Sequence, residues 1–347
     1  MQRAKKILLV SNYRPDRQYS MLHYSNWLHA SLNEHGYQAE RKEPPARFGH
    51  LVAANSTASK WLGYLDKYLF FPFELLAISR QFDLVHICDH SNALYRWFCR
   101  GRPVLITCHD MLAIRVARGE IEGQRTRWSG KILQWLILNS LKRIRYFCCV
   151  SEATKSDVIR LVGDSGRNIR TIHLPLNYDY RPLAEHEVAA RLQHAGINIA
   201  GPFFLHVGGD QWYKNKTGIL KLFLVLKRDP RFRDHSLVFI GQPIKSKTKD
   251  LWRNRKLYED IHEIENPSSD IIHALYCRAE ALLFISLYEG YGWPVLEAQA
   301  CGCPVITSNR EPMTSVGGAA AGEMMRTSLI SRLACSSESL KRDRNDS

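Results

Sequence analysis

The chain has 347 residues, a length that predicts two domains of ordinary size. No apolar run approaches the ~18–20 residues of a transmembrane helix, the run after the basic start is too short for a signal peptide, and no cysteine spacing matches a zinc finger. The formal net charge of +14, from 48 basic and 34 acidic residues, favours an anionic membrane surface or an anionic acceptor as partner. No nucleic-acid-binding module accompanies that charge, so no nucleic acid is expected.

The first half alternates strand and helix patterns, which indicates an α/β domain. An apolar strand at Lys6–Ser11 is followed by a helical stretch at Leu22–Glu34 that ends at Gly36. Further strands are expected at Phe82–Cys88, Pro103–Cys108 and Tyr146–Val150. Ser151 then fits the N-cap of a helix. The nine cysteines are predicted to be free, mostly buried thiols in a reducing cytoplasm.

An aromatic-rich stretch at residues 60–78 leaves two interpretations open. Apolar residues recur there at helical spacing until Pro72 interrupts them, at Trp61, Leu62, Leu65, Tyr68 and Leu69. The stretch is either a kinked core helix or an amphipathic segment that enters a bilayer interface.

The second half repeats the alternation after Thr171–Leu176. The predicted elements are a strand and Gly turn at Phe204–Gly209, a helix at Gly218–Leu226, a strand at Leu237–Gly241, a helix at Ile271–Ala279, and strands at Ala281–Leu287 and Pro304–Thr307. This pattern indicates a second α/β domain.

A Gly-rich turn and a short helix join the last two strands. Pro294 fits the first helical position and Gly302 the residue just past the helix end. The start of such a helix favours an anion, for instance a diphosphate, by ~0.3–1 kcal/mol from its dipole alone. Glu289 leaves the carboxyl end of the preceding strand, and Glu297 lies one helical turn in, with its side chain leaning toward the same place.

Two carboxylates beside an anion need partners other than a phosphate. Carboxylates accept hydrogen bonds from vicinal hydroxyls, so one of them suits a ribose diol and the other the hydroxyls of a sugar. On spacing alone, a solvated Glu297 and a turn-capping Glu289 are equally good interpretations.

Residues 289–309, EGYGWPVLEAQACGCPVITSN, resemble the signature of the retaining glycosyltransferases of family 4. This family has the GT-B fold, an α/β architecture of two Rossmann-like domains with parallel sheets that face across a cleft. The resemblance implies that Glu297 binds the nucleotide ribose and Glu289 the donor sugar. The turn and helix start would serve the sugar and diphosphate, through Gly290, Tyr291, Gly292, Trp293, Pro294 and Val295.

Two other segments are similar to the same family. The turn at Gly208 and Gly209, followed by Lys214 and Lys216, resembles the loop where a basic pair holds the donor phosphates. A Lys about 4 Å from a phosphate charge contributes ~4 kcal/mol at an effective dielectric of 20, which would stabilise the leaving diphosphate. His109, after the strand Pro103–Cys108, takes the place of a family histidine that contacts the donor sugar, with His86 and His90 as weaker candidates. Without the resemblance, solvated lysines and a structural histidine would be the plainer interpretations.

The resemblance implies a hexosyltransferase with Glu289, His109 and Lys214 as catalytic residues. It would move a mannosyl- or glucosyl-type hexose from a nucleoside diphosphate sugar to a glycan or lipid-linked acceptor in cell-surface polysaccharide synthesis. The leaving phosphate would help to take the acceptor's proton. No cofactor is expected, and no metal, because the sequence lacks an Asp-x-Asp motif. The expected location is cytoplasmic, peripheral on the inner face of the plasma membrane.

The expected domains are an acceptor-side domain at residues 1–178, a hinge at 179–200, a nucleotide-sugar domain at 201–323 and a disordered tail at 324–347. The loop Asn12–Met21 lacks the family's glycines, which leaves the acceptor class open. The resemblance stops near Glu323, so the family's last helix, which returns to the first domain, is expected to be missing. Two alternatives therefore remain, namely a non-catalytic remnant that binds a sugar nucleotide and a sugar-nucleotide epimerase of similar fold.

Overall fold

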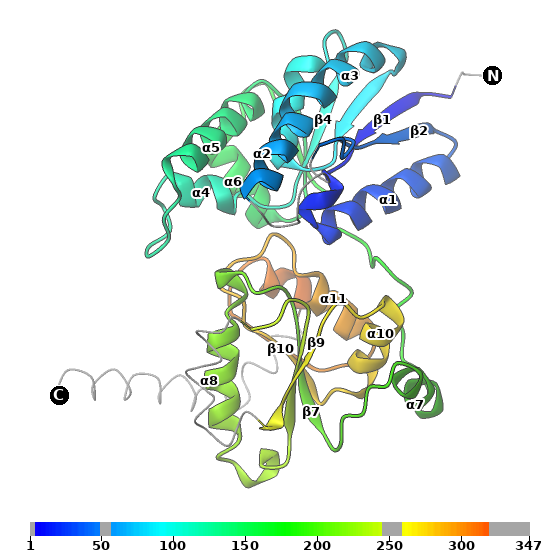
Figure 1. The fold of residues 1–347 in the computed structure, drawn as a ribbon, viewed down its shortest axis with the longest axis vertical. Coiled ribbons are helices and arrows are strands. Elements are labelled where there is room, and N and C mark those ends of the chain that lie inside the picture. Colours follow the sequence, from blue (N-terminus) through cyan, green and yellow to red (C-terminus); the bar gives the residue numbers. More distant parts are fainter. Residues whose placement is uncertain (1–3, 49–56, 245–258, 319–347) are drawn as a thin grey trace, which may run out of the picture. The chain divides into compact units, whose positions relative to one another are not determined.

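The computed structural model describes residues 4–48, 57–244 and 259–318. The chain divides into two compact units, Met1–Asn177 and Tyr178–Ser347, and each contains a parallel sheet (Figure 1). The predicted α/β class with two parallel sheets is confirmed. The division falls next to the expected boundary at residue 178. The predicted tail at 324–347 lies outside the described residues.

The first unit is built on a six-stranded sheet with the order β2-β1-β3-β4-β5-β6, in which every neighbouring pair is parallel. Its strands are β1 (Lys6–Val10), β2 (Gln38–Lys42), β3 (Leu84–Ile87), β4 (Val104–Cys108), β5 (Tyr146–Cys149) and β6 (Asn168–Thr171). The chain moves outward from β1 to β2 and then returns across β1 to β3. The carboxyl ends of β1 and β3 therefore form the switch point, where α/β sheets place their ligands.

The helices of the first unit include a continuous helical run over residues 57–78, interrupted by a π-helical turn, which agrees with the kinked-helix interpretation of 60–78. They are α1 (Tyr19–Glu34), α2 (Thr57–Leu65), α3 (Phe71–Ile78), α4 (Leu112–Ala117), α5 (Trp128–Leu141) and α6 (Glu152–Val162), with a π-helical turn at Asp66–Phe70 and a 3-10 helix at His90–Phe98. Pro72 lies in the first turn of α3, directly after the π-helical turn. Phe71 and Leu75 enter the core, whereas Trp61 and Phe73 are exposed. The core interpretation is thus confirmed for one side of this stretch, and its other side faces solvent.

The second unit is built on a five-stranded parallel sheet with the order β11-β10-β7-β8-β9. Its elements are α7 (Glu185–His194), β7 (Phe203–Val207), α8 (Lys216–Leu226), β8 (Ser236–Ile240), β9 (Ile261–Ile264), α10 (Ser269–Arg278), β10 (Ala281–Phe284), α11 (Trp293–Ala300) and β11 (Val305–Thr307). In Figure 1, α8 lies on one side of the sheet and α10 and α11 on the other. The switch point lies between β7 and β10. Residues 179–200, predicted to be a hinge, contain α7, which packs on α10.

Each unit has its own apolar core, with Phe71, Tyr95 and Phe147 in the first and Phe223 and Phe239 in the second. The eight cysteines within the described residues are free, and all but Cys277 are buried, as the sequence predicted for them. Among the helices of the described part of the chain, none combines the length and the apolar character needed to cross a bilayer.

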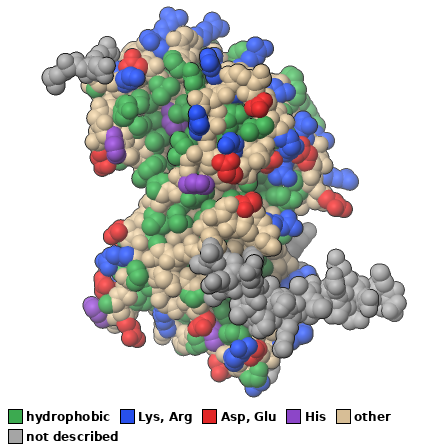
Figure 2. All heavy atoms as spheres, turned by 180° about the vertical axis from the view of Figure 1, so that it is seen from behind, with side chains coloured by type: hydrophobic (Ala, Val, Ile, Leu, Met, Phe, Trp, Pro, Cys, Tyr) green, Lys and Arg blue, Asp and Glu red, His purple; other side chains and the backbone are tan. Residues whose placement is uncertain are grey.

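Apolar side chains also lie at the surface of the first unit. A hollow of about 380 Å³ beside α1 is lined mainly by apolar side chains, among them Ile7, Trp27, Leu105 and Phe147. Figure 2 likewise shows hydrophobic side chains gathered on one face of this unit.

Candidate functional site

The second unit brings two loops together at the carboxyl ends of β7 and β10. Leu287 N–H donates to the Tyr213 carbonyl (2.7 Å), and Asn215 Nδ2 donates to the Ile285 carbonyl (3.0 Å). Asn215 adopts a left-handed conformation (φ 58°) and caps α8 by accepting a hydrogen bond from Gly218 N–H. The loop that carries Lys214 is therefore fastened to the segment that carries Glu289.

Lys214 and Glu289 form an ion pair at this place. Lys214 Nζ lies 2.8 Å from Glu289 Oε1 and 3.0 Å from Oε2, and both side chains are mostly buried. The ammonium group also lies 5.4 Å from the centre of the Phe284 ring. Because an ammonium has three N–H donors and the carboxylate takes at most two, one donor remains for a further acceptor.

Close backbone packing explains the glycines next to this pair. Gly241 has a φ of 115°, and a Cβ there would lie 2.4 Å from the Gly208 carbonyl oxygen, so no larger residue fits. A Cβ on Gly208 would come within 3.1 Å of His206 Nε2. A side chain at Gly208 would therefore cover the imidazole beneath it. A Cβ on Gly209 would collide with the Gln211 side chain.

Two buried polar atoms at the same strand ends lack a partner among the described residues, namely His206 Nε2 and Ser286 Oγ. His206 Nδ1 donates to the Leu283 carbonyl (2.9 Å), so Nε2 is left as an acceptor. Burial, with the charges of Lys216 and Lys214 nearby, lowers the pKa of His206 to about 3 and keeps the ring neutral. Buried polar atoms without partners are uncommon and suit a ligand or an ordered water. Sequence reasoning missed both residues, although each lies at the end of a predicted strand.

The first turn of α11 follows the predicted geometry. Gly292 is the N-cap with a φ of 106°, Pro294 lies in the first turn, and Gly302 (φ 75°) follows the C-cap Cys301. Tyr291 is buried beside this turn. Gly302 lies just past the helix end as predicted, whereas Pro294 is the second helical residue and not the first.

Glu297 is buried on the inner side of α11. Its carboxylate accepts a hydrogen bond from the Tyr276 hydroxyl of α10 (2.8 Å). Burial and the Glu297 charge raise the pKa of Tyr276 well above its ordinary value, so the phenol remains a donor. The Tyr180 ring packs edge-on against Tyr276 at 5.8 Å. The solvated interpretation of Glu297 is wrong, because α10 covers this face of the helix.

Lys216 lies in the first turn of α8 and is buried. Its ammonium donates to the Gln242 carbonyl and lies 5.5 Å from the centre of the Phe239 ring. It is therefore not a solvated loop charge, and it occupies a different place from Lys214.

The first unit gathers polar side chains at the ends of β1, β3 and β4. His109 follows β4, and its Nε2 donates to the Cys88 carbonyl (3.0 Å) while its ring meets Tyr24 edge-on at 4.8 Å. Burial lowers the pKa of His109, although the charge of Asp89 acts in the opposite direction. His86, by contrast, lies within β3 and contacts Thr107 Oγ1 (2.8 Å), and burial lowers its pKa to about 4.

Asp89 is the buried carboxylate of this group, and sequence reasoning did not single it out. It accepts hydrogen bonds from Asn12 Nδ2 (2.6 Å) and Ser91 N–H (3.0 Å), and His90 Nδ1 lies 3.2 Å away. Burial works to raise the pKa of Asp89, but His90, His109 and Asn12 together outweigh it and leave the pKa lowered. The same contact raises the pKa of His90 against the effect of burial. The two residues thus form a buried contact between a carboxylate and an imidazole at the switch point, and this contact favours the protonated form of His90.

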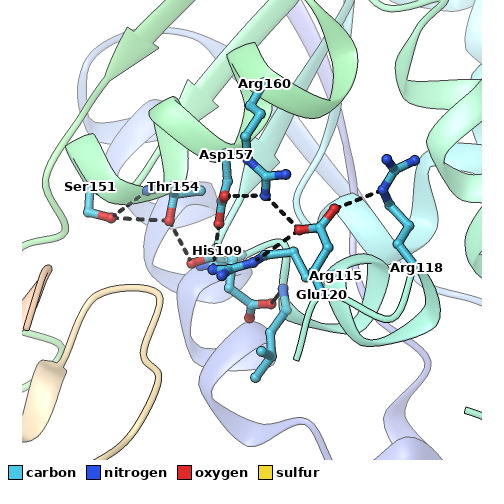
Figure 3. A network of polar contacts seen from close by, with 10 residues as sticks. His109, Arg115, Arg118, Glu120, Ser151, Thr154, Asp157 and Arg160 are labelled. Atoms are coloured by element: carbon cyan, nitrogen blue, oxygen red, sulfur yellow. Dashed lines mark hydrogen bonds and ion pairs between the residues drawn. The ribbon is translucent and has the colours of Figure 1, made fainter. Parts of the chain in front are cut away.

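A charged network fastens the segment that follows His109 (Figure 3). Glu120 contacts Arg118 (2.8 Å) and Arg160 (2.9 Å), and Asp157 contacts Arg160 (2.8 Å) and Arg115 (3.1 Å). These contacts connect α4 and its following turn to α6. Separately, the His109 carbonyl accepts a hydrogen bond from Thr154 Oγ1 (3.3 Å). The Thr154 N–H donates to Ser151 Oγ, so Ser151 caps α6 as predicted.

One group among the described residues could hold a metal ion, with His273, Cys277 and Cys301 offering ligand atoms within 4.8 Å of one another. His273 Nε2 already contacts the backbone carbonyl of Arg181 (2.5 Å). Cys301 follows the last turn of α11, about 12 Å along the helix from its start. The group is therefore distinct from the Lys214–Glu289 pair.

Comparison with known proteins gives both halves of the chain the same assignment. The model described as Glycosyltransferase Family 4 matches residues 31–180, and the model described as Glycosyl transferases group 1 matches residues 192–343. The O-antigen chain mannosyltransferase B of Escherichia coli is 29% identical over 204 residues, which are 56% of this chain and 50% of that protein. The chain spans half the length of this relative and 26% of the length of a serotype-specific mannosyltransferase of the same species.

Solved structures show the same fold. Sucrose-phosphate synthase from Thermosynechococcus elongatus has a TM-score of 0.64 at 15% identity, over 94% of this chain and 90% of that one. Anabaena HepE, in complex with UDP-glucose, has a TM-score of 0.58 at 14% identity, over 88% of this chain and 80% of that one. Since the two family models together cover most of the sequence and the two sheets have the GT-B architecture, the chain belongs to the family 4 glycosyltransferases.

Proposed function

We propose that this chain transfers a hexosyl residue, of mannosyl or glucosyl type, from a nucleoside diphosphate sugar to a glycan or lipid-linked acceptor, with retention of configuration. The observation that carries the proposal is the Lys214–Glu289 pair at the switch point of the second sheet. A cation and a carboxylate side by side suit a donor that offers a diphosphate and sugar hydroxyls together.

The roles follow from the chemistry of each group. Lys214 stabilises the leaving diphosphate through its remaining N–H donor, assisted by the first turn of α11. Glu289 accepts hydrogen bonds from hydroxyls of the transferred sugar. Glu297, oriented by Tyr276, accepts from the ribose diol. A neutral His109 contacts the donor sugar, and the leaving phosphate takes part in removing the acceptor's proton.

The buried atoms without partners add support to a donor site in the second unit. His206 Nε2 is a neutral acceptor and Ser286 Oγ can donate or accept, so both fit hydroxyl groups better than a phosphate. Gly208 and Gly209 let the backbone approach a ligand, and Lys216 adds positive charge close to the same loop. We assign none of these roles to a metal.

A sequence relative and a structural neighbour guide the choice of donor sugar and of biosynthetic process. The relative is an O-antigen chain mannosyltransferase, and the neighbour has been solved with UDP-glucose. We therefore propose a part in cell-surface polysaccharide synthesis. The proposed location is the cytoplasm, peripheral on the inner face of the plasma membrane.

Incubation of the pure protein with GDP-mannose, UDP-glucose and other sugar nucleotides, with and without a membrane extract, tests the proposal. Release of free nucleoside diphosphate that depends on the extract supports it, and NMR of the product reports whether the anomeric configuration is retained. Donor binding without turnover would instead indicate a non-catalytic sugar-nucleotide-binding protein. Conversion of one sugar nucleotide into its isomer would indicate an epimerase.

A further inference from the structure

Helix α5 exposes an apolar face to solvent. Trp128 (76% exposed), Ile132 (50%), Trp135 (63%) and Leu136 (39%) occupy positions spaced four, three and one residues apart. This spacing places them along one side of the helix. The opposite side carries Ile137 and Leu141, which are buried in the core of the first unit. The helix therefore has an apolar inner side for the core and a second apolar side without a partner among the described residues.

The stretch of sequence around α5 contains basic residues and no acidic ones. Residues 123–151 contain six basic side chains and no Asp or Glu. All six are exposed, at Arg125, Arg127, Lys131, Lys142, Arg143 and Arg145. Two of them immediately precede α5 and three follow it, so the exposed tryptophans lie between two groups of cations.

A third exposed tryptophan extends this surface. Trp97, on the 3-10 helix that packs along α5, is half exposed and donates through Nε1 to Ser140 Oγ of α5 (2.9 Å). The guanidinium of Arg143 lies 5.8 Å from the centre of its ring. On the other flank, a hollow of about 330 Å³ between α4 and α5 combines Ile114 and Leu138 with the basic Arg118 and Lys131.

We propose that this surface, the α5 face formed by Trp97, Trp128, Ile132, Trp135, Leu136 and the six surrounding cations, docks on the anionic surface of a lipid bilayer. Tryptophan rings occupy the headgroup region of membranes, where one end of the ring is wet and the other apolar. Basic side chains next to such a face bind the phosphate groups of anionic lipids. The inference makes the membrane location in the proposed function specific, and lipid binding can be measured independently of sugar transfer.

Charge favours a membrane over a second copy of this chain. A two-fold contact through the α5 face would set one group of six cations against another, which like-charge repulsion opposes. The exposed side of α2 and α3, with Trp61 and Phe73, is also apolar. Within residues 61–78 the cation Lys67 is paired with Asp16, and Glu74 lies on α3. These residues therefore carry no unpaired cation and provide a matched control.

Sedimentation of the full chain with vesicles tests the proposal. We expect vesicles of 30% phosphatidylglycerol in phosphatidylcholine to bind at least tenfold more tightly than pure phosphatidylcholine, since each nearby cation contributes about fivefold. Trp128→Ala with Trp135→Ala should weaken binding about tenfold or more through lost apolar contact. Arg127→Glu with Lys131→Glu should weaken it at least as much and reduce its dependence on salt.

Two control variants should change vesicle binding less than twofold. Trp61→Ala removes a tryptophan of similar exposure from α2, and Lys221→Glu reverses an exposed charge on α8. Circular dichroism and donor binding confirm that each variant is folded. Equal binding to both kinds of vesicle, or equal losses from the α5 and control variants, would overturn the proposal.

Size-exclusion chromatography with light scattering tests self-association. A wild-type dimer that the Trp128→Ala/Trp135→Ala variant converts to a monomer would also overturn the proposal, because the face would then belong to a subunit contact. Vesicle binding through α5 without release of nucleoside diphosphate would leave the docking surface standing and contradict the transferase function. The two proposals therefore fail by different results.

Discussion

Lys214 and Glu289 lie 75 positions apart in the sequence and share two contacts of 2.8 and 3.0 Å between the ammonium and the carboxylate. The Lys214 side chain is 17% exposed and the Glu289 side chain 9%. Because both charges are largely removed from water, each depends on the other for compensation. The pair can therefore serve the stability of the loop, the binding of a donor, or both.

A double substitution separates these roles. Lys214→Ala should lower the rate of nucleoside diphosphate release about 10²–10³-fold, because the charge proposed to stabilise the leaving group is lost. If the two charges served only to neutralise each other, the double variant Lys214→Met/Glu289→Gln would restore activity along with folding. We expect it to restore the melting temperature and to stay inactive. Recovered turnover in the double variant would refute the assignment of Lys214 to the leaving group.

The hydrogen bond from Tyr276 to Glu297 gives a second prediction. Tyr276→Phe removes one hydrogen bond to a charged acceptor and should weaken donor affinity about 10-fold, with little effect on the maximal rate. Glu297→Ala should weaken affinity about 10–100-fold, because both ribose hydroxyls lose their proposed acceptor. Calorimetric titration with the nucleoside diphosphate measures both effects. Tyr180→Phe keeps the ring that packs on Tyr276 and serves as the control, and unchanged affinity in Glu297→Ala would exclude the ribose role.

The sequence predicted those elements whose local chemistry leaves little choice. The run from β10 through α11 to β11 has an apolar strand, a proline at the helix start and a glycine just past its end, and each appears at or next to its expected place. Strands β2 (QAERK) and β9 (IHEI) were missed, because both are edge strands with polar side chains and carry no buried apolar run. Helix α5 was missed because it is apolar on two sides and so lacks a clear helical period.

The candidate site was predictable only in part, for a similar reason. Glu289, Glu297, Lys214 and His109 stand at strand ends or in a helix start, where a family signature or the topology draws attention to them. Asp89 and His206 become notable only when their surroundings are known. Asp89 is a buried carboxylate in contact with His90. His206 is a neutral ring with a buried nitrogen that has no hydrogen-bond partner among the described residues. Such properties arise from packing between segments far apart in sequence, which no local pattern records.

The buried, neutral histidines predict that the free energy of unfolding depends on pH in the acid range. Burial, reinforced by Lys216 and Lys214, lowers the pKa of His206 to about 3, and burial with the His109 charge lowers that of His86 to about 4. The unfolded chain takes up protons at these groups below about pH 6.5 and the folded chain does not. The contribution of these two histidines to the free energy of unfolding should therefore be constant above about pH 7 and fall as the pH drops from about 6.5 toward 4, by up to ~1.4 kcal/mol per pH unit for each histidine.

Urea titrations between pH 7 and pH 4.5 measure this slope. His206→Leu should reduce the slope whatever it does to stability at pH 7, because the substituted residue cannot bind a proton. His186→Gln, at an exposed position on α7, should leave the slope unchanged. An identical slope in His206→Leu and wild type would mean that His206 is not the buried neutral group described here.

The charged network around Glu120 attaches α4 to α6. A substitution there tests whether this network also positions His109. Hydrogen bonds from Arg160 and Arg118 hold the pKa of Glu120 below its ordinary value despite partial burial. Glu120→Ala removes the carboxylate that contacts Arg118 and leaves Arg115 and Arg160 with Asp157 alone, and should cost about 1 kcal/mol, or about 2–4 °C in melting temperature. The loss should shrink in 0.5 M salt, because the arginines are about half exposed. Glu122→Ala, at an exposed neighbouring position, is the control and should have no effect.

The same variant should leave the kinetics nearly unchanged, within about twofold in KM and kcat. His109 is held independently of Glu120, since its ring donates to the Cys88 carbonyl and its own carbonyl accepts from Thr154 Oγ1. His109→Ala, by contrast, should lower kcat/KM by a larger factor, of the order of 10–100-fold, because the proposed contact to the donor sugar is lost. If Glu120→Ala reduced kcat as strongly as His109→Ala, the arginine network would have to position the histidine, and the two hydrogen bonds at His109 would be insufficient to hold it.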